Sequence, residues 1–174
     1  MKHIFYGTML FIMMGLFGCK SNEPLPVADN VDLERYSGKW YEIAAFPQRF
    51  QKGCACTSAE YQLTDKNYIR VINRCKKPDG WDEAEGKAFV QKGTGNAKLK
   101  VQFFWPFRGK YWIIGLDEDY KWALVGHPNR DYLWILSRTR DMDETTYQKI
   151  LSMAEEKNFD TSRLKVTRHE CREE

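Results

Sequence analysis

The chain has 174 residues, with 27 Lys and Arg against 24 Asp and Glu, and a formal net charge of +3. This length suits a single domain after a short leader, and the mixed, nearly balanced charge without a basic block excludes a nucleic-acid surface. Aromatic residues make up 14% of the chain, enough for a large core or an apolar cavity. No internal repeat or low-complexity segment is visible.

An apolar run over residues 4–18 opens the chain after a positively charged start. It is shorter than the roughly 20 apolar residues that cross a bilayer, and its small final residue is typical of a secretory signal. A short uncleaved anchor is the alternative. Leu16–Cys19 resembles the lipobox of bacterial lipoproteins, although Phe17 replaces its usual small residue. The resemblance implies a signal peptide, residues 1–18, and acyl chains such as palmitate on Cys19.

Residues 19–30 carry two prolines and no periodicity, so we expect the acylated cysteine to be followed by a flexible tether and the folded domain to span residues 31–174. Lys20, rather than Asp, follows Cys19, which in enteric bacteria favours the outer membrane. The protein is therefore expected at the bacterial cell outer membrane, to which the lipid on Cys19 anchors it.

Short runs of alternating polarity, separated by turn residues, fill most of the remaining chain. Eight strands are predicted, over residues 39–46, 57–63, 67–75, 85–91, 97–104, 110–117, 121–126 and 131–138. One helix is predicted within residues 143–159, where apolar side chains recur at helical spacing. Because one helix cannot cover both faces of such a sheet, we predict an all-β fold: an up-and-down antiparallel barrel with a C-terminal helix packed outside.

Aromatic side chains gather on the faces expected to point inward. Tyr132, Trp134, Leu136 and Arg138 share one face of their strand, and Leu99, Val101, Phe103 and Trp105 share one face of another. An eight-stranded barrel is wide enough either to be filled by side chains or to hold one small ligand. The pattern alone leaves both interpretations open.

Three segments resemble the motifs of the lipocalin family in order and spacing. Gly38-Lys39-Trp40 matches the first, and residues 115–139 match the other two, with Asp117 and Tyr120 in the second and Arg138 in the third. The similarity covers residues 31–170 and is nearest to the bacterial outer-membrane lipoprotein lipocalins and apolipoprotein D. It implies that Trp40 closes one end of the barrel with Arg138 packed across it.

The resemblance also implies a ligand at the open end, of the fatty acid or lysophospholipid class. The matching positions are Tyr61, Asn73, Phe103, Tyr111, Trp112 and Trp134. Strand alternation lets only one of Tyr111 and Trp112 point inward. The expected function is carriage or storage of small lipophilic molecules in the cell envelope, with the membrane as a partner through the N-terminal lipid. The sequence leaves open whether the protein forms a homodimer.

The loop FFWPFRGKYW, residues 103–112, admits two interpretations. Phe104, Trp105, Phe107 and Lys110 near the barrel mouth can contact a membrane, since aromatic and basic side chains favour that interface. Alternatively, Pro106 and Phe107 fold back on the barrel.

Five cysteines are present, and lipid on Cys19 leaves four, which allow three disulfide connectivities. The resemblance implies that Cys56 pairs with Cys171, which leaves Cys54 for Cys75. The main alternative joins Cys56 to Cys75 and Cys54 to Cys171. Because Cys54 and Cys56 lack the spacing of a zinc site, no metal is expected.

No nucleophile elbow, zinc-protease motif or phosphate-binding loop occurs in the chain, so neither catalytic residues nor a cofactor are expected. Two alternatives to a carrier remain. One is a lipocalin-fold enzyme that acts on a lipophilic substrate, and the other is a structural envelope protein with a filled barrel.

Overall fold

The computed structural model describes residues 24–171, to which all structural statements below refer. The signal peptide, Cys19 and residues 20–23 of the expected tether therefore lie outside the described residues. The rest of that segment, residues 24–30, lies against the barrel, since Leu25 is buried and the Ala28 N–H donates to the Ile113 carbonyl. The strands are β1 (Gly38–Ala45), β2 (Ala55–Leu63), β3 (Ile69–Lys77), β4 (Gly80–Val90), β5 (Lys98–Gln102), β6 (Gly109–Leu116), β7 (Trp122–Gly126), β8 (Leu133–Ser137) and β9 (Lys165–Val166). The helices are α1 (Leu33–Tyr36), α2 (Glu144–Glu156) and the 3-10 turns η1 (Arg49–Gln51) and η2 (Thr161–Arg163).

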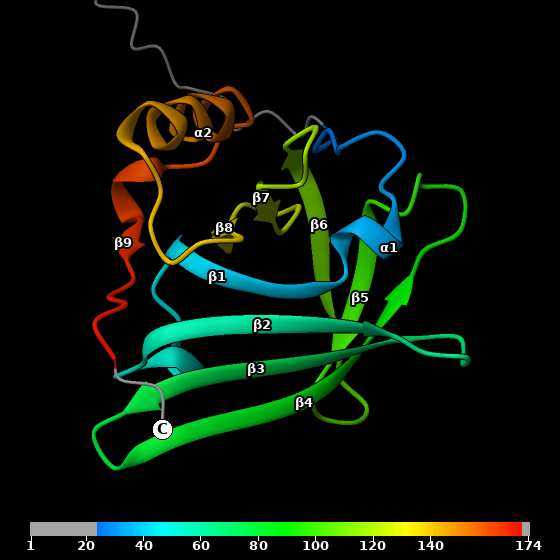
Figure 1. Ribbon diagram of the computed structural model, residues 1–174. Coiled ribbons are helices and arrows are strands. Elements are labelled where there is room, and N and C mark those ends of the chain that lie inside the picture. The colour runs from blue at the N-terminus through cyan, green and yellow to red at the C-terminus, as the bar shows by residue number, and fades with distance from the viewer. Residues whose placement is uncertain (1–23, 172–174) are drawn as a thin grey trace, which may run out of the picture.

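Strands β1 to β8 form a closed antiparallel barrel (Figure 1). Each strand pairs with the next in the chain, and the circle closes because β1 pairs with both β2 and β8. Loops that follow odd-numbered strands therefore share one end of the barrel, and α1 lies at the other end, beside the start of β1. The prediction of an eight-stranded up-and-down barrel is confirmed.

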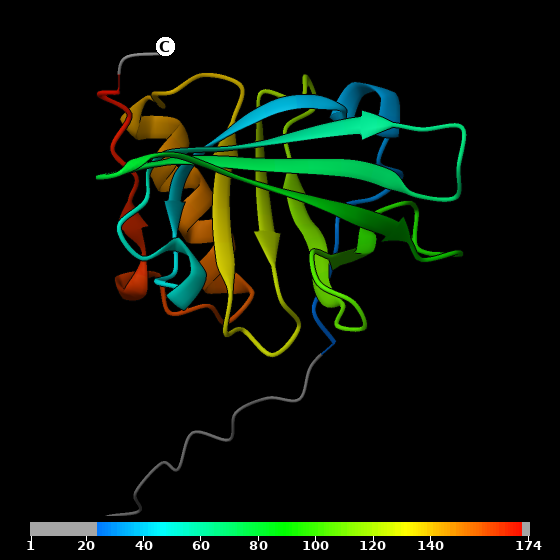
Figure 2. The same ribbon diagram turned by 90° about the horizontal axis from the view of Figure 1, so that it is seen from below.

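Helix α2 packs against the outside of the barrel (Figure 2). Its N-terminus is capped by Asp143, whose carboxylate accepts a hydrogen bond from the backbone N–H of Thr146 at 2.9 Å. Ile150 and Ala154 are fully buried against an apolar cluster from β1, β6, β7 and β8. Burial of this second face explains why β7 is buried at every position, since both of its faces are covered.

The C-terminal segment completes the barrel wall where β2 leaves β1. The first half of β1 pairs with β2 as far as Tyr41, and its second half pairs with β9 at Ala44 and Ala45. The backbone N–H of Thr167 donates to the Ile43 carbonyl at 2.9 Å, and that of Cys56 donates to the Arg168 carbonyl at 2.7 Å. Residues from the two ends of the chain are therefore neighbours in one sheet.

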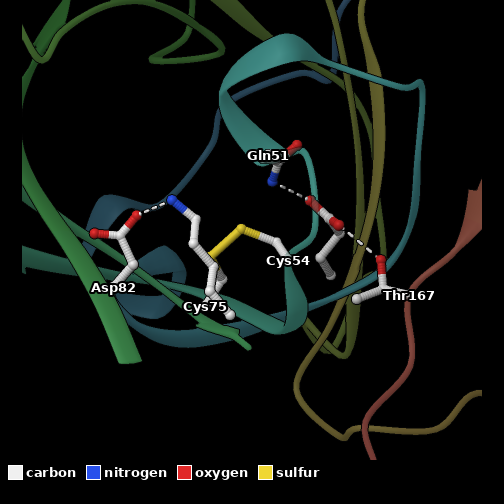
Figure 3. Close-up of a disulfide and its surroundings, with 7 residues drawn as sticks. Gln51, Cys54, Cys75, Asp82 and Thr167 are labelled. Carbon is white, nitrogen blue, oxygen red and sulfur yellow. Dashed lines mark hydrogen bonds and ion pairs between the residues drawn. A yellow bond between two sulfur atoms is a disulfide. The ribbon is translucent and has the colours of Figure 1, made fainter. Parts of the chain in front are cut away.

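Two disulfides lie near this junction. Cys54 is bonded to Cys75, and Cys56 is bonded to Cys171, with sequence separations of 21 and 115. The first links the β1–β2 loop to the end of β3 (Figure 3), and the second ties the C-terminal segment to β2. Within residues 24–171, no group of three or more His, Cys, Asp or Glu side chains is placed to hold a metal ion.

Three details differ from the sequence-based expectation. Strand β4 starts at Gly80 rather than at residue 85, because it continues into a tight hairpin in which Lys77 pairs with Gly80. Neither α1 nor β9 was expected, since segments of four and two residues are too short to show periodicity. In the described part of the chain, no helix has the length and apolar character needed to cross a bilayer.

Candidate functional site

One end of the barrel is closed by Trp40 and the side chains around it. Trp40 has no exposed surface, and its indole N–H donates to the Tyr36 carbonyl at 2.8 Å. The Arg138 guanidinium lies 3.7 Å from the centroid of the indole ring, within the range of a cation–π contact. It also donates to the carbonyls of Lys39 and Arg35, at 2.8 and 2.6 Å. These contacts close this end of the barrel, and we call the closure the seal.

The other motif residues shape the backbone around that seal. Gly38 has a φ of +87°, a conformation that favours glycine, immediately before the strand that carries Trp40. Asp117 holds the β6–β7 turn, since its carboxylate accepts from the backbone N–H groups of Asp119 and Lys121. The Tyr120 hydroxyl accepts from the Asp32 N–H at 2.8 Å and so fastens α1 to this turn. We therefore assign these residues a structural role.

Above the seal, three tyrosines meet inside the barrel. The Tyr61 hydroxyl donates to that of Tyr111 at 2.8 Å, and the hydroxyls of Tyr36 and Tyr111 are also 2.8 Å apart. Burial raises the pKa of all three phenols, most clearly for Tyr36 and Tyr111, so they stay neutral. Tyr36 comes from α1 and was not anticipated; the capping residue Asp32 was the available sequence signal for this short helix.

Solvent exposure of the inward-facing side chains rises steadily toward the other end. Leu99 on β5 is buried, whereas Val101 and Phe103, each two residues further on, are partly exposed. From β8 into the loop that precedes it, the same gradient runs from buried Leu136 through Trp134 to exposed Tyr132. Water therefore reaches the barrel interior from the end that carries the loops after β1, β3, β5 and β7. We call this end the mouth.

The structure brings five of the six predicted ligand-site residues to the inner face. Tyr61, Phe103, Tyr111 and Trp134 belong to the interior cluster, and Asn73 shares a face of β3 with buried Val71. Tyr111 lies 6.3 Å from Trp134 between ring centroids, and Trp134 is stacked on Tyr132 at 6.0 Å. Together these side chains form an aromatic wall below the mouth.

Trp112, by contrast, does not line the interior. It packs with the outer cluster beneath α2, and the Lys98 ammonium lies 4.1 Å from its ring centroid. The physical reason is strand alternation: Tyr111 points inward, so its neighbour points outward. The assignment of Trp112 to the ligand site is therefore wrong.

Sequence reasoning missed a buried carboxylate on the inner face of β1. Glu42 is only 7% exposed and accepts hydrogen bonds from Gln51 at 2.8 Å and from Thr167 at 2.6 Å. Figure 3 shows Gln51 and Thr167 approaching this carboxylate from opposite sides. Burial raises the pKa of Glu42, and the hydrogen bond from Thr167 opposes that shift more strongly than the one from Gln51. No local pattern marks Glu42, because Thr167 arrives from the far end of the chain.

We expect Glu42→Gln to stabilise the fold at neutral pH. The raised pKa of Glu42 means that the folded state binds a proton more tightly than the unfolded state. The stabilisation that comes from this proton is fully present below the unfolded pKa, and it is lost as pH rises through the folded pKa. The amide removes the cost of burying a charge. In urea denaturation, the difference from the parent should be largest near about pH 7 and vanish near about pH 4.

The matched control is Glu118→Gln, a change at an exposed carboxylate in the β6–β7 turn, which should leave the free energy of unfolding at neutral pH close to that of the parent. A Glu42→Gln protein that is less stable than the parent at neutral pH would show that the charged form is favoured in the fold.

The interior of a closed eight-stranded barrel is wide enough either to be filled by side chains or to hold one small ligand. A family model described as "Lipocalin-like domain" matches residues 31–169. The chain belongs to the lipocalin family.

Relatives identify the branch of the family. The chain is 44% identical over 151 residues to "Outer membrane lipoprotein Blc" of Escherichia coli (strain K12), covering 84% of this chain and 85% of that protein. It is 32% identical over 178 residues to "Apolipoprotein D" of Macaca fascicularis, covering 93% and 94%. The predicted resemblance is thus confirmed.

Among solved structures, insecticyanin from the tobacco hornworm Manduca sexta matches with a TM-score of 0.68 and 21% identity, covering 83% of this chain and 84% of that one. At this identity the match supports the fold alone.

Proposed function

We propose that the protein binds one small lipophilic molecule, of the fatty acid or lysophospholipid class, in the mouth half of the barrel. Membership of the lipocalin family supports the binding of lipophilic small molecules in general. The observation that carries the finer proposal is the gradient of exposure along β5 and β8, which leaves aromatic inward-facing side chains accessible from the mouth.

The chemistry of this wall suits an acyl chain. Phe103, Tyr111, Trp134 and Val101 offer apolar surface at which dispersion contacts accumulate along a hydrocarbon. Phe103 lies against Gly86, where an added Cβ would approach its ring to 2.8 Å, so β4 presents no side chain at this point. Asn73 supplies a polar group that can position a hydroxyl or ester of the ligand.

A structural role with a filled barrel is the second candidate, because the hydrogen-bonded side chains of Tyr36, Tyr61 and Tyr111 already fill part of the interior. A hollow of about 350 Å³ lies on the surface rather than inside the barrel, between residues 27–30 and 93–98. We favour binding over catalysis, because the four cysteines of the domain are bonded in disulfides and supply no free thiol. A binding or transport role also agrees with the family relatives.

The test is a binding series with a chain that starts at Lys20, which keeps every described element. Saturated fatty acids and lysophospholipids of increasing length should quench intrinsic fluorescence. Each added methylene contributes about 0.8 kcal/mol, or up to about fourfold in affinity. The increase should stop once the chain reaches the tyrosine cluster. Absence of a response across the series, with no lipid in native mass spectra of the protein extracted from its membranes, would favour the filled barrel.

Variants locate the site. By calorimetry, Trp134→Ala should weaken binding by about tenfold, because the ligand loses an aromatic wall. Trp112→Ala is the matched control, since Trp112 lies on the outer face and its loss leaves the interior wall intact. Equal affinities for both variants would place the ligand elsewhere.

We also propose that Cys19 anchors the protein in the outer membrane through lipid. The sequence at Leu16–Cys19 and the relatives named outer membrane lipoproteins support this location. Cys19→Ser should prevent acylation, so the expressed protein should move from the membrane fraction to the soluble fraction, with loss of the acyl mass at the N-terminus. Lys20→Ser serves as the control and should leave acylation unchanged. Membrane fractionation of Cys19→Ser identical to that of the parent would contradict the anchor.

A further inference from the structure

Exposed aromatic side chains are concentrated at the mouth. Phe104, Trp105 and Phe107 in the β5–β6 loop are 78%, 86% and 77% exposed, and Phe50 in the β1–β2 loop is 67% exposed. Tyr132 on the β7–β8 loop is also exposed. Of the large apolar side chains that are exposed among residues 24–171, only Leu63 and Val166 lie away from these loops. Phe107 therefore does not fold back on the barrel.

The β5–β6 loop presents these rings as a defined turn. The Phe107 backbone N–H donates to the Phe104 carbonyl at 2.9 Å, which places Trp105 at the tip. Arg108, next in the chain, lies over the ring of Phe89 at 4.1 Å from its centroid. This contact supports the base of the turn from the outer side of β4.

The charge in the β1–β2 and β5–β6 loops, which carry Phe50, Phe104, Trp105 and Phe107, has one sign. Residues 46–54 contain Arg49 and Lys52, and residues 103–110 contain Arg108 and Lys110, without any Asp or Glu in either segment. At the β3–β4 loop, which also lies at the mouth, the positive charge of Lys77 is neutralised by an ion pair with Asp82. The β7–β8 loop, which carries Tyr132, contains both a basic and an acidic residue, Arg130 and Asp131. The loops that carry Phe50, Trp105 and their neighbours therefore present four cations without an acidic residue in either loop.

The course of the N-terminal segment points to the same side. The Val31 N–H donates to the Gly95 carbonyl at the sealed end, and the Ala28 N–H donates to the Ile113 carbonyl halfway along β6. Further back, Leu25 packs in the cluster with Phe46 and Leu133, which lie at the mouth ends of β1 and β8. The chain thus leaves the described domain at Pro24 on the mouth side, and the stretch from there to Cys19 spans at most about 20 Å.

We propose that the mouth docks on the surface of an anionic phospholipid bilayer. Phe50, Phe104, Trp105 and Phe107 enter the interfacial region, where aromatic rings are favoured, while the four cations contact lipid phosphates. A second copy of the chain fits this surface less well. Two-fold pairing of the same loops would bring like charges together, with no acidic side chains in these segments to compensate them. An anionic membrane is therefore the partner that fits the aromatic side chains and positive charge of the mouth, and this docking does not depend on a ligand inside the barrel.

The test is cosedimentation of the chain that starts at Lys20, and so has no lipid of its own, with vesicles of phosphatidylethanolamine and phosphatidylglycerol. We expect binding that weakens at high salt and is much weaker on neutral phosphatidylcholine vesicles. The triple variant Phe104→Ser/Trp105→Ser/Phe107→Ser should lose at least about tenfold in partition coefficient. Arg108→Glu/Lys110→Glu should lose binding to anionic vesicles only.

Leu63→Ser/Val166→Ser is the matched control, because it removes the exposed apolar side chains outside the mouth and should bind as the parent does. Circular dichroism and thermal unfolding establish that each variant is folded. Trp134→Ala, which weakens the proposed ligand site, should still bind vesicles, so failure of docking and failure of ligand binding are distinguishable. No vesicle binding by the parent, or an equal loss in the control variant, would overturn the proposal. So would a dimer in sedimentation velocity that the triple variant abolishes.

Discussion

Replacing Trp40 with alanine is expected to lower the free energy of unfolding by about 3 to 5 kcal/mol, the usual cost of removing a large buried aromatic side chain. Trp40 has no exposed surface, donates to the Tyr36 carbonyl and lies under Arg138. Its removal therefore leaves a cavity and also removes the surface on which the guanidinium stacks. Because domains are stable by only about 5–15 kcal/mol, the variant should lie close to the unfolding threshold.

Urea denaturation measures this effect, with the slope compared between proteins to verify that unfolding remains two-state. Trp40→Phe keeps most of the volume and should lose less stability while keeping its affinity for ligand, since Trp40 lies below the tyrosine cluster. Trp112→Ala, on the partly exposed outer face, should be less costly than Trp40→Ala. A Trp40→Ala protein as stable as Trp112→Ala would contradict the role of Trp40 in closing the barrel.

Removing the Cys56–Cys171 bond with Cys56→Ser/Cys171→Ser should cost about 4 to 5 kcal/mol. The bond closes a loop with a sequence separation of 115, and the chain-entropy estimate of stabilisation grows with loop length. Cys54→Ser/Cys75→Ser, with a separation of 21, should cost about 3 kcal/mol. Denaturation of the two double variants under identical conditions gives the comparison.

Peptide mapping of the unreduced protein checks the connectivity on which this rests. We expect one peptide pair that contains Cys54 and Cys75 and another that contains Cys56 and Cys171. Detection of Cys56 linked to Cys75 would contradict the assignment without altering the barrel.

The barrel was predictable because its strands bury one face and expose the other. Alternation is strong in segments such as 97–104 and 131–138, and its period sets the inward face of each strand. It fails at the start of β4, where residues 82–85 are exposed on both faces beyond the barrel rim. A strand without a buried face carries no hydrophobic period, so the prediction started too late.

Which residues of a strand face the barrel interior was harder to predict. Tyr111 and Trp112 are both large and aromatic, so composition cannot tell which one faces inward. The outer face of β6 is also apolar, because α2 covers it, and a register shift follows between Ile113 and Gly115. Long-range contacts decide such cases, as they do for Glu42, whose partner Thr167 is remote in sequence.

The pairing of β1 with β9 has a consequence for the order in which the molecule can be completed. β1 is among the first elements to leave the ribosome. Its second half pairs with β8 on one edge, but the other edge obtains a neighbour only when residues 165–168 have been made. A nascent or partly translocated chain therefore keeps an unsatisfied strand edge beside the mouth until residues 165–168 arrive. Residues 165–168 are therefore the last to join the barrel wall. In proteins truncated before residue 165, the free edge of β1 should remain able to pair with strands of other chains.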